Sequence, residues 1–494
     1  MIELSELIEG IYLIANWQVP VLIFCGMWIG MIFGVIPGLT GALSIAILLP
    51  FTFMLSPLNA LILLTSVYTG GLTGGGITAV LINTPGTPGA VATTYDGYPM
   101  TKKGMQNEAL GLQVSSSVIG GIAGYIFLLL FISPMVRIAL AFGPSEMVFL
   151  TVFVIIVIGS IGEENLWRTL MVGFLGLIMG TVGTSEATGV IRGTLGFAEL
   201  EDGIPISVCI IGMFAIPEFL QIITRSYIAE KSIESGQDFT KLMKGVRKTF
   251  SSVKTLVRSA LIGISMGVLP GVGSTIGCLM SYSQASRNAG PDQKFGHGEP
   301  EGIIAAETAN NASEGGAMAI LLALGIPGSA STAILVSAFM LHGLVPGPRL
   351  LETHGPLVYG LITANLLQMV ILVVIAVFVA YYMSRIIFIP TRILVPCLIP
   401  IMVMGAYSFR NSYFDVYLFF IFGMVGWFFR RNDFSLVSFM IGLIMGKRLD
   451  IEVYRYFALF GPDLSVFVKR PISSLFLCLI VLILAMNLFR KIRN

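Results

Sequence analysis

Four short segments rich in glycine and proline carry the clearest chemistry in this sequence. They read GLTG at 38–41, NTPGTPG at 83–89, GVGST at 271–275 and GIPGSAS at 325–331. Proline removes a backbone donor and glycine frees the backbone, so each segment is expected to interrupt a helix. At membrane depth, interrupted backbone is tolerated only where it is buried in protein or lines a wet cavity. Simple kinks are the alternative interpretation.

Such interruptions favour binding of a small anion together with a cation. The N-terminal ends of half-helices present free N–H groups to a carboxylate, whereas freed carbonyls suit Na⁺. Because the segments contain no Lys or Arg, hydroxyl, amide and backbone groups would hold the anion. The substrate-binding candidates are Thr40, Asn83, Thr84, Gly86, Thr87, Ser274, Thr275, Asn310, Asn311, Gly328, Ser329 and Ser331. The cation-binding candidates are Gly38, Pro85, Gly271 and Pro327, with Na⁺ as the coupling ion and no other cofactor or metal.

Several flanking stretches extend this interpretation. Residues 73–76 (TGGG) and the Asn310-Asn311 pair with Gly315-Gly316 are expected to be unwound like the segments that follow them. Residues 96–99 (DGYP) are expected to form a turn. Glu307, after the polar loop 296–302, is expected on the solvated surface, although a coupling-ion role remains open.

The composition identifies the environment that these segments require. The 494-residue chain is 55% hydrophobic and only 11% charged, with a mean hydropathy of +0.89. Soluble domains carry about 25% charged residues, so a soluble enzyme, a nucleic-acid-binding protein and a disordered scaffold are excluded. No charged residue lies between positions 10 and 95. We therefore expect an all-α polytopic membrane protein with about 11–13 membrane segments.

The sequence also contains an internal repeat. GMIFGVIPG at 30–38 matches GISMGVLPG at 263–271 at an offset of 233, and Pro85-Gly86 matches Pro327-Gly328 at an offset of 242. The arm at 1–16 has three Glu and no base, whereas the arm at 225–258 has eight bases and three acids. Because cytoplasmic loops are enriched in bases, the two arms should lie on opposite sides. We expect two inverted repeats with broken helices and re-entrant hairpins, at 1–230 and 254–494, joined by a basic cytoplasmic connector at 231–253.

At these motifs the chain resembles the large membrane subunit of the tripartite tricarboxylate transporter family. The resemblance covers essentially the whole length. Its motifs are GVIPGLTG at 34–41, NTPGTPGAVATTYDGYP at 83–99, GVLPGVGST at 267–275, FGHGEPEGIIAAETANNASEGGA at 295–317 and LGIPGSAS at 324–331. One departure is Ala306, where the family pattern has proline before the glutamate.

The resemblance implies a multi-pass carrier in the bacterial inner membrane. It implies two partners, a small membrane subunit of about four spans and a periplasmic solute-binding protein. It further implies secondary import of citrate or related carboxylates, driven by a gradient of Na⁺ or H⁺, with an elevator-like movement by analogy.

Two other classes of function compete with a partner-dependent carrier. A channel or exporter working without partners is compatible with the hydropathy, and ungated conductance would support it. An intramembrane enzyme needs a catalytic constellation, but the sequence has no Walker loop or HExxH motif, and its five cysteines are far apart. The sequence therefore favours a transporter and not an enzyme.

Overall fold

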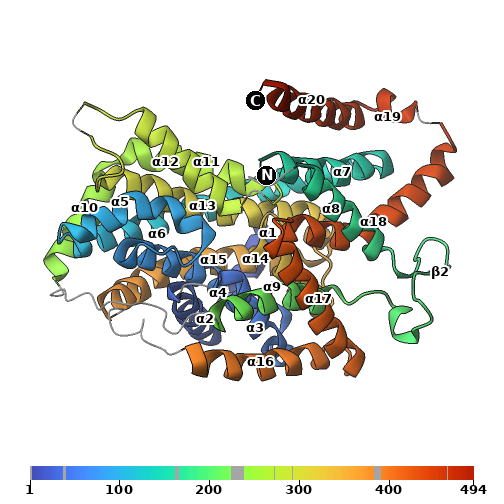
Figure 1. The fold of residues 1–494 in the computed structure, drawn as a ribbon, viewed down its shortest axis with the longest axis horizontal. Helices are drawn as coiled ribbons and strands as arrows, with labels where there is room; N and C mark the ends of the chain where they lie inside the picture. Colours follow the sequence, from blue (N-terminus) through green and yellow to red (C-terminus); the bar gives the residue numbers. More distant parts are fainter. Residues whose placement is uncertain are drawn as a thin grey trace. The chain divides into compact units, whose positions relative to one another are not determined.

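The computed structural model describes residues 3–36, 40–161, 166–223, 238–271, 273–291, 293–382, 391–463 and 465–493. These residues form twenty α-helices and three short 3-10 helices (Figure 1). Within the described part, the strands are β1 (Gly183–Thr184) and β2 (Ile191–Arg192), which pair antiparallel. The predicted all-α class is confirmed.

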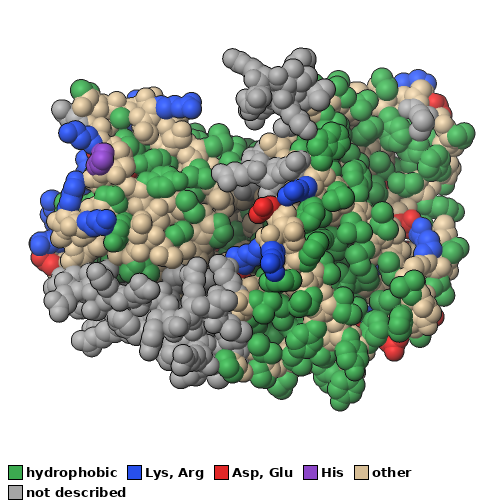
Figure 2. All heavy atoms as spheres, in the orientation of Figure 1, with side chains coloured by type: hydrophobic (Ala, Val, Ile, Leu, Met, Phe, Trp, Pro, Cys, Tyr) green, Lys and Arg blue, Asp and Glu red, His purple; other side chains and the backbone are tan. Residues whose placement is uncertain are grey.

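The helices have the length and surface of membrane segments. Five are long and apolar enough to cross a membrane, and six shorter apolar helices accompany them. Large hydrophobic side chains such as Trp17, Phe174 and Val374 are exposed, and hydrophobic side chains cover broad areas of the face in Figure 2. Because exposed apolar surface of this extent is stable only against lipid or protein, the chain is a multi-pass membrane protein. The number of crossings stays a prediction.

The chain folds into two compact units, and each takes segments from both halves of the sequence. Unit 1 comprises 1–134 and 218–408, and unit 2 comprises 135–217 and 409–494. Unit 1 contains α1 (Leu4–Ile14), α2 (Gln18–Val35), α3 (Gly41–Leu48), η1 (Leu49–Met54), α4 (Pro57–Ile82), η2 (Pro88–Ala90), α5 (Val91–Lys102), most of α6 (Gln106–Leu140), α10 (Phe239–Ser251), α11 (Val253–Val268), α12 (Gly273–Arg287), α13 (Pro300–Leu324), α14 (Ala330–Leu341), α15 (Pro348–Tyr382) and α16 (Thr391–Ser408).

Unit 2 is the smaller of the two. It contains the end of α6, α7 (Pro144–Ile161), α8 (Leu166–Gly180), β1, β2, η3 (Ala198–Leu200), most of α9 (Ile206–Ile223), α17 (Tyr413–Arg431), α18 (Leu436–Phe460), α19 (Val466–Lys469) and α20 (Pro471–Arg493). The units do not coincide with the sequence repeats, whose boundaries stay a prediction.

Two close helix crossings dominate unit 1. Helix α2 packs along α4, and α11 packs along α13. A Cβ on Gly34 would overlap the carbonyl of Gly71, and a Cβ on Gly267 would overlap that of Ser313. Small residues at such spacing let helix backbones meet closely. The two contacts are related by the offsets of the sequence repeat, 233 and 242. The opposite orientation of the two copies stays a prediction.

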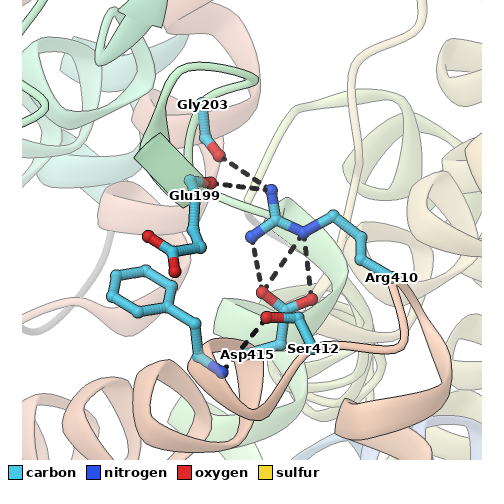
Figure 3. A network of polar contacts seen from close by, with 6 residues as sticks. Glu199, Gly203, Arg410, Ser412 and Asp415 are labelled. Atoms are coloured by element: carbon cyan, nitrogen blue, oxygen red, sulfur yellow. Dashed lines mark hydrogen bonds and ion pairs between the residues drawn. The ribbon is translucent and has the colours of Figure 1, made fainter. Parts of the chain in front are cut away.

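Unit 2 is held by a similar glycine crossing and by a polar network (Figure 3). Gly176 of α8 lies against the Phe439 carbonyl of α18. The Arg410 guanidinium pairs with Asp415, whose carboxylate is fully buried, and it also donates to the carbonyls of Glu199 (3.2 Å) and Gly203 (3.4 Å). The hydrogen bonds to Asp415 raise the pKa of the Arg410 guanidinium above its usual range. This network therefore fixes the start of α17 to the η3 loop.

Candidate substrate and cation site

The first and fourth interruptions lie together in unit 1, because α14 packs against α3 and α4. Thr40 caps α3 by accepting a hydrogen bond from the Leu43 amide (3.3 Å). Ser329 caps α14 in a reciprocal capping box with Thr332, an arrangement that satisfies the free amides of a helix start. The Ser329 hydroxyl also lies 3.2 Å from the Tyr68 hydroxyl on α4.

The second and third interruptions also meet. The 3-10 helix η2, which follows NTPGT, packs against α12 and α13. A Cβ on Gly89 would overlap both the Ser274 hydroxyl on α12 and the Asn310 amide oxygen on α13. Only glycine therefore lets these two polar side chains lie at the η2 backbone. Each interruption thus meets one from the other half of the chain.

Each proline–glycine tip also folds back on its own crossing. In the first half, the Gly86 amide donates to the Gly75 carbonyl (3.2 Å), and its Cα faces the Gly34 carbonyl. In the second half, Gly328 accepts a hydrogen bond from the Gly271 amide (3.1 Å), and it lies against the Gly267 carbonyl. Gly86 and Gly328 thus occupy corresponding places, as their offset of 242 predicts.

Polar groups without partners gather where η2 meets α12 and α13. Asn310 is fully buried, and its amide oxygen meets no hydrogen-bond partner in the described part of the chain, whereas its amide nitrogen lies beside the Glu307 carboxylate. The hydroxyl of Thr87, which is 5% exposed, is unpartnered as well. A buried polar group without a partner costs about 1–3 kcal/mol. A ligand that bonded these groups would recover that cost.

The other candidates lie around these two meeting points. Asn83 is exposed and ends α4 with a left-handed φ of 57°, and the half-buried Thr84 donates to its neighbour Ile82 (3.3 Å). The Asn311 amide donates to the Thr73 hydroxyl (3.1 Å).

The remaining candidates are placed as follows. Thr275 and Pro85 are half-buried, whereas Ser331 and Pro327 are buried. Gly271 has a left-handed φ of 73°. Gly38 falls outside the described residues.

Three local predictions are wrong. Residues 73–76 lie inside continuous α4, and Asn310 to Gly316 lie inside continuous α13. The glycines in these stretches let neighbouring segments approach closely. For example, a Cβ on Gly75 would lie only 2.6 Å from the Thr87 hydroxyl. Contacts of this kind stabilise the continuous helix. Residues 96–99 belong to α5 because Asp96 is buried there and accepts bonds from the amides of Gly298 (2.7 Å) and Glu299 (2.8 Å).

The prediction that Glu307 is solvated is wrong as well. The most unusual feature of unit 1 is a pair of buried glutamates, of which Glu307 is one. Glu307 and Glu314 on α13 are both fully buried. Glu307 accepts hydrogen bonds from Thr93 (2.5 Å), Ser117 (2.8 Å) and Gln113 (3.2 Å). Both glutamates interrupt an otherwise uncharged run at 302–348, and their seven-residue spacing places them on one helix face. That spacing is the signal in the sequence that identifies them.

Comparison with known proteins identifies the family. Residues 21–441 match the model of the tripartite tricarboxylate transporter TctA family. The chain belongs to this family. A TctA-family chain is a membrane component of a transport system with further subunits, and this membership favours a transporter over an enzyme.

Two relatives come from Agrobacterium vitis. One, an uncharacterized 52.8 kDa protein in the TAR-I ttuC' 3'region, is 31% identical over 95% of this chain and 93% of its own length. The other, an uncharacterized protein in the TAR-II ttuC' 3'region, is 31% identical over 47% of this chain and 96% of its own length. No solved structure matches this TctA-family chain.

Proposed function

We propose that this chain is the translocating subunit of a secondary importer for citrate or related carboxylates. Its family supports the transport of tricarboxylates. The observation that carries the proposal is the pairwise meeting of four interrupted segments inside unit 1, with the unpartnered amide oxygen of Asn310 and hydroxyl of Thr87 at one meeting point. Buried polar groups are usually hydrogen-bonded, and a bound ligand would supply the missing partners at this meeting point.

The substrate carboxylates would be bound without a basic residue. The starts of α12 and α14 carry positive partial charge from their helix dipoles, and the hydroxyl of Ser274 and the amide of Asn310 add neutral donors. An anion held only by such groups and a co-bound cation would be released readily once the cation leaves. That property suits a carrier, which must release its substrate on the other side.

The remaining parts of the proposal follow the family and the repeat. We assign the chain to the bacterial inner membrane, with a small membrane subunit and a periplasmic solute-binding protein as partners. Two inverted repeats would supply the two sides of the site, and the motif-bearing helices would move in an elevator-like manner. A cation gradient would drive uptake, with Na⁺ preferred.

Transport by the reconstituted system tests the proposal. Proteoliposomes holding both membrane subunits, with the binding protein added, should accumulate labelled citrate under an inward cation gradient. Asn83→Ala, Asn310→Ala and Ser329→Ala combined should abolish accumulation. The exposed pair Ser283→Ala and Asn288→Ala on the outer part of α12 and just beyond it is the matched control and should retain it.

Two results would contradict the proposal. Unchanged accumulation in the triple variant would refute the site. Ungated conductance of the chain alone in a bilayer recording would favour a channel instead.

A further inference from the structure

The carboxylate of Glu314 has an unusual environment in the middle of unit 1. One oxygen accepts hydrogen bonds from the hydroxyls of Thr69 on α4 and Tyr125 on α6, both at 2.5 Å. Gln368 on α15 in turn donates to the Thr69 hydroxyl (2.9 Å). The second oxygen, Oε2, is buried and has no hydrogen-bond partner in the described part of the chain.

The groups that donate hydrogen bonds to the Glu314 carboxyl group are all neutral. The Thr69 hydroxyl accepts a hydrogen bond from Gln368 and lies within donor distance of both the Glu314 carboxyl group (2.5 Å) and the Thr65 carbonyl (3.2 Å). Tyr125 donates to the same oxygen. No Lys, Arg or His among the described residues forms an ion pair with Glu314. Since a buried carboxylate without a counter-charge is very costly, Glu314 must take up either a proton or a metal cation from outside the chain.

A second buried oxygen without a hydrogen-bond partner belongs to Asn311, one helical turn away from Glu314. The Asn311 amide donates to Thr73 (3.1 Å), but its carbonyl oxygen is buried without a partner. Asn311 and Glu314 are three positions apart on α13, and Thr73 and Thr69 are four positions apart on α4, so each pair shares a helix face. The α4–α13 interface thus offers two unsatisfied oxygens, one from a carboxyl group and one from an amide, beside two hydroxyls.

We infer that Glu314 and Asn311, with the hydroxyls of Thr69 and Thr73, form the site of the co-transported cation and that this cation is Na⁺. The inference rests on the proposed function, because it names the coupling site of that carrier. An all-oxygen set of carboxylate, amide and hydroxyl groups suits Na⁺. A proton would satisfy only the carboxylate and would leave the Asn311 oxygen unpaired.

Glu307 provides the matched contrast on the same helix. Both of its oxygens accept hydrogen bonds, from Thr93 on one side and from Ser117 and Gln113 on the other. A carboxylate with three donors is already stabilised by the protein. The structure therefore assigns ion coupling to Glu314 and a structural role to Glu307.

The complete transport system tests this assignment. Wild type, E314Q and E307Q are reconstituted with the partner subunits and the binding protein. Labelled citrate uptake is measured under an inward Na⁺ gradient, and under a pH gradient with Na⁺ equal on both sides. Citrate exchange is measured with all ions equal. Wild type should accumulate citrate only with the Na⁺ gradient. E314Q should lose about tenfold or more of that accumulation and retain exchange, and E307Q should keep its dependence on Na⁺.

A binding measurement supports the transport experiment. The purified chain in detergent is heated in Na⁺ and in choline, because a ligand that binds the folded state raises its stability. Na⁺ should raise the apparent Tm of wild type and E307Q, but not that of E314Q. Asn311→Ala should shift the Na⁺ dependence to higher concentration, and it tests the site if E314Q does not fold.

The outcomes separate the inference from the proposed function. Na⁺-driven accumulation that persists in E314Q, or an unchanged Na⁺ response in Asn311→Ala, overturns the inference alone. Wild-type accumulation driven only by the pH gradient overturns the Na⁺ assignment. Wild-type chain that accumulates citrate under neither gradient overturns the proposed function, and the inference fails with it.

Discussion

Replacing Gly86 by alanine tests the closest approach in unit 1. A Cβ at this position would overlap the Gly34 carbonyl oxygen and would lie 2.8 Å from the Cα of Gly75. Both neighbours are backbone atoms, so no side-chain rotation relieves the overlap. The proline–glycine tip must therefore move away from α2 and α4.

Two effects lower the free energy of unfolding of the Gly86→Ala variant. Overpacking a tight interior costs about 1–3 kcal/mol, and loss of the buried hydrogen bond from Gly86 to Gly75 adds about 1–2 kcal/mol. The sum is roughly 2–5 kcal/mol, which for a chain of 494 residues corresponds to an apparent Tm lower by on the order of 2–5 °C. Gly328→Ala should cost less, because its Cβ would lie 2.7 Å from the Gly267 carbonyl oxygen and the Gly328 carbonyl can keep its hydrogen bond.

Thermal unfolding of the purified chain in detergent measures these differences. Fluorescence-detected size-exclusion after heating gives the temperature at which half of the monodisperse protein is lost. Gly277→Ala is the matched control, because its Cβ would make only an ordinary 3.4 Å contact with Met266. A Gly86→Ala variant as stable as the Gly277→Ala control would refute the close packing of this tip.

Three further predictions concern single side chains. Asn310→Leu should abolish the rise in apparent Tm that citrate produces, because it removes the buried amide where η2 meets α12 and α13; an undiminished rise would contradict a role of this amide in binding citrate. Ser329→Ala should cost about 0.5–2 kcal/mol of stability through loss of the capping box, whereas Ser331→Ala, outside the box, should cost less in the same melt. Asp415→Asn should lower the free energy of unfolding by about 2–4 kcal/mol, an effect smaller than for a fully buried ion pair because Arg410 is partly exposed. An unchanged melting temperature would contradict the network in Figure 3.

Hydropathy and the spacing of glycine–proline motifs predict the class of this fold well. Long uncharged runs leave only helices as an option, and the structure contains helices there. The repeated motifs also predict that Gly86 and Gly328 occupy corresponding places. Those features depend on local composition and on backbone constraints that act within a few residues.

The sequence is a poorer guide to where the helices break. Glycine runs such as 73–76 suggest unwound backbone, but in α4 they serve as contact surfaces for neighbouring helices. Intrinsic propensity is weak beside such packing. Whether a glycine opens a helix or lets another helix approach depends on the partner, which a single sequence does not name.

The buried glutamates show the same limit. Glu307 and Glu314 follow a polar loop, so sequence context favours the surface for Glu307. Their burial depends on donors from distant segments, such as Thr69, Tyr125 and Gln113. Only the assembled helices bring those hydroxyl and amide groups to the carboxylates.

Substrate protection of Ser274→Cys tests the central claim most directly. In a background in which the five native cysteines are replaced by serine, the new thiol lies at the meeting point of α12, η2 and α13, next to Gly89. Citrate and Na⁺ together should slow its modification by a methanethiosulfonate reagent, while Ser283→Cys, the control at an exposed position of α12, should react at the same rate with or without them. Equal modification rates of Ser274→Cys with and without citrate would contradict a substrate site at this position.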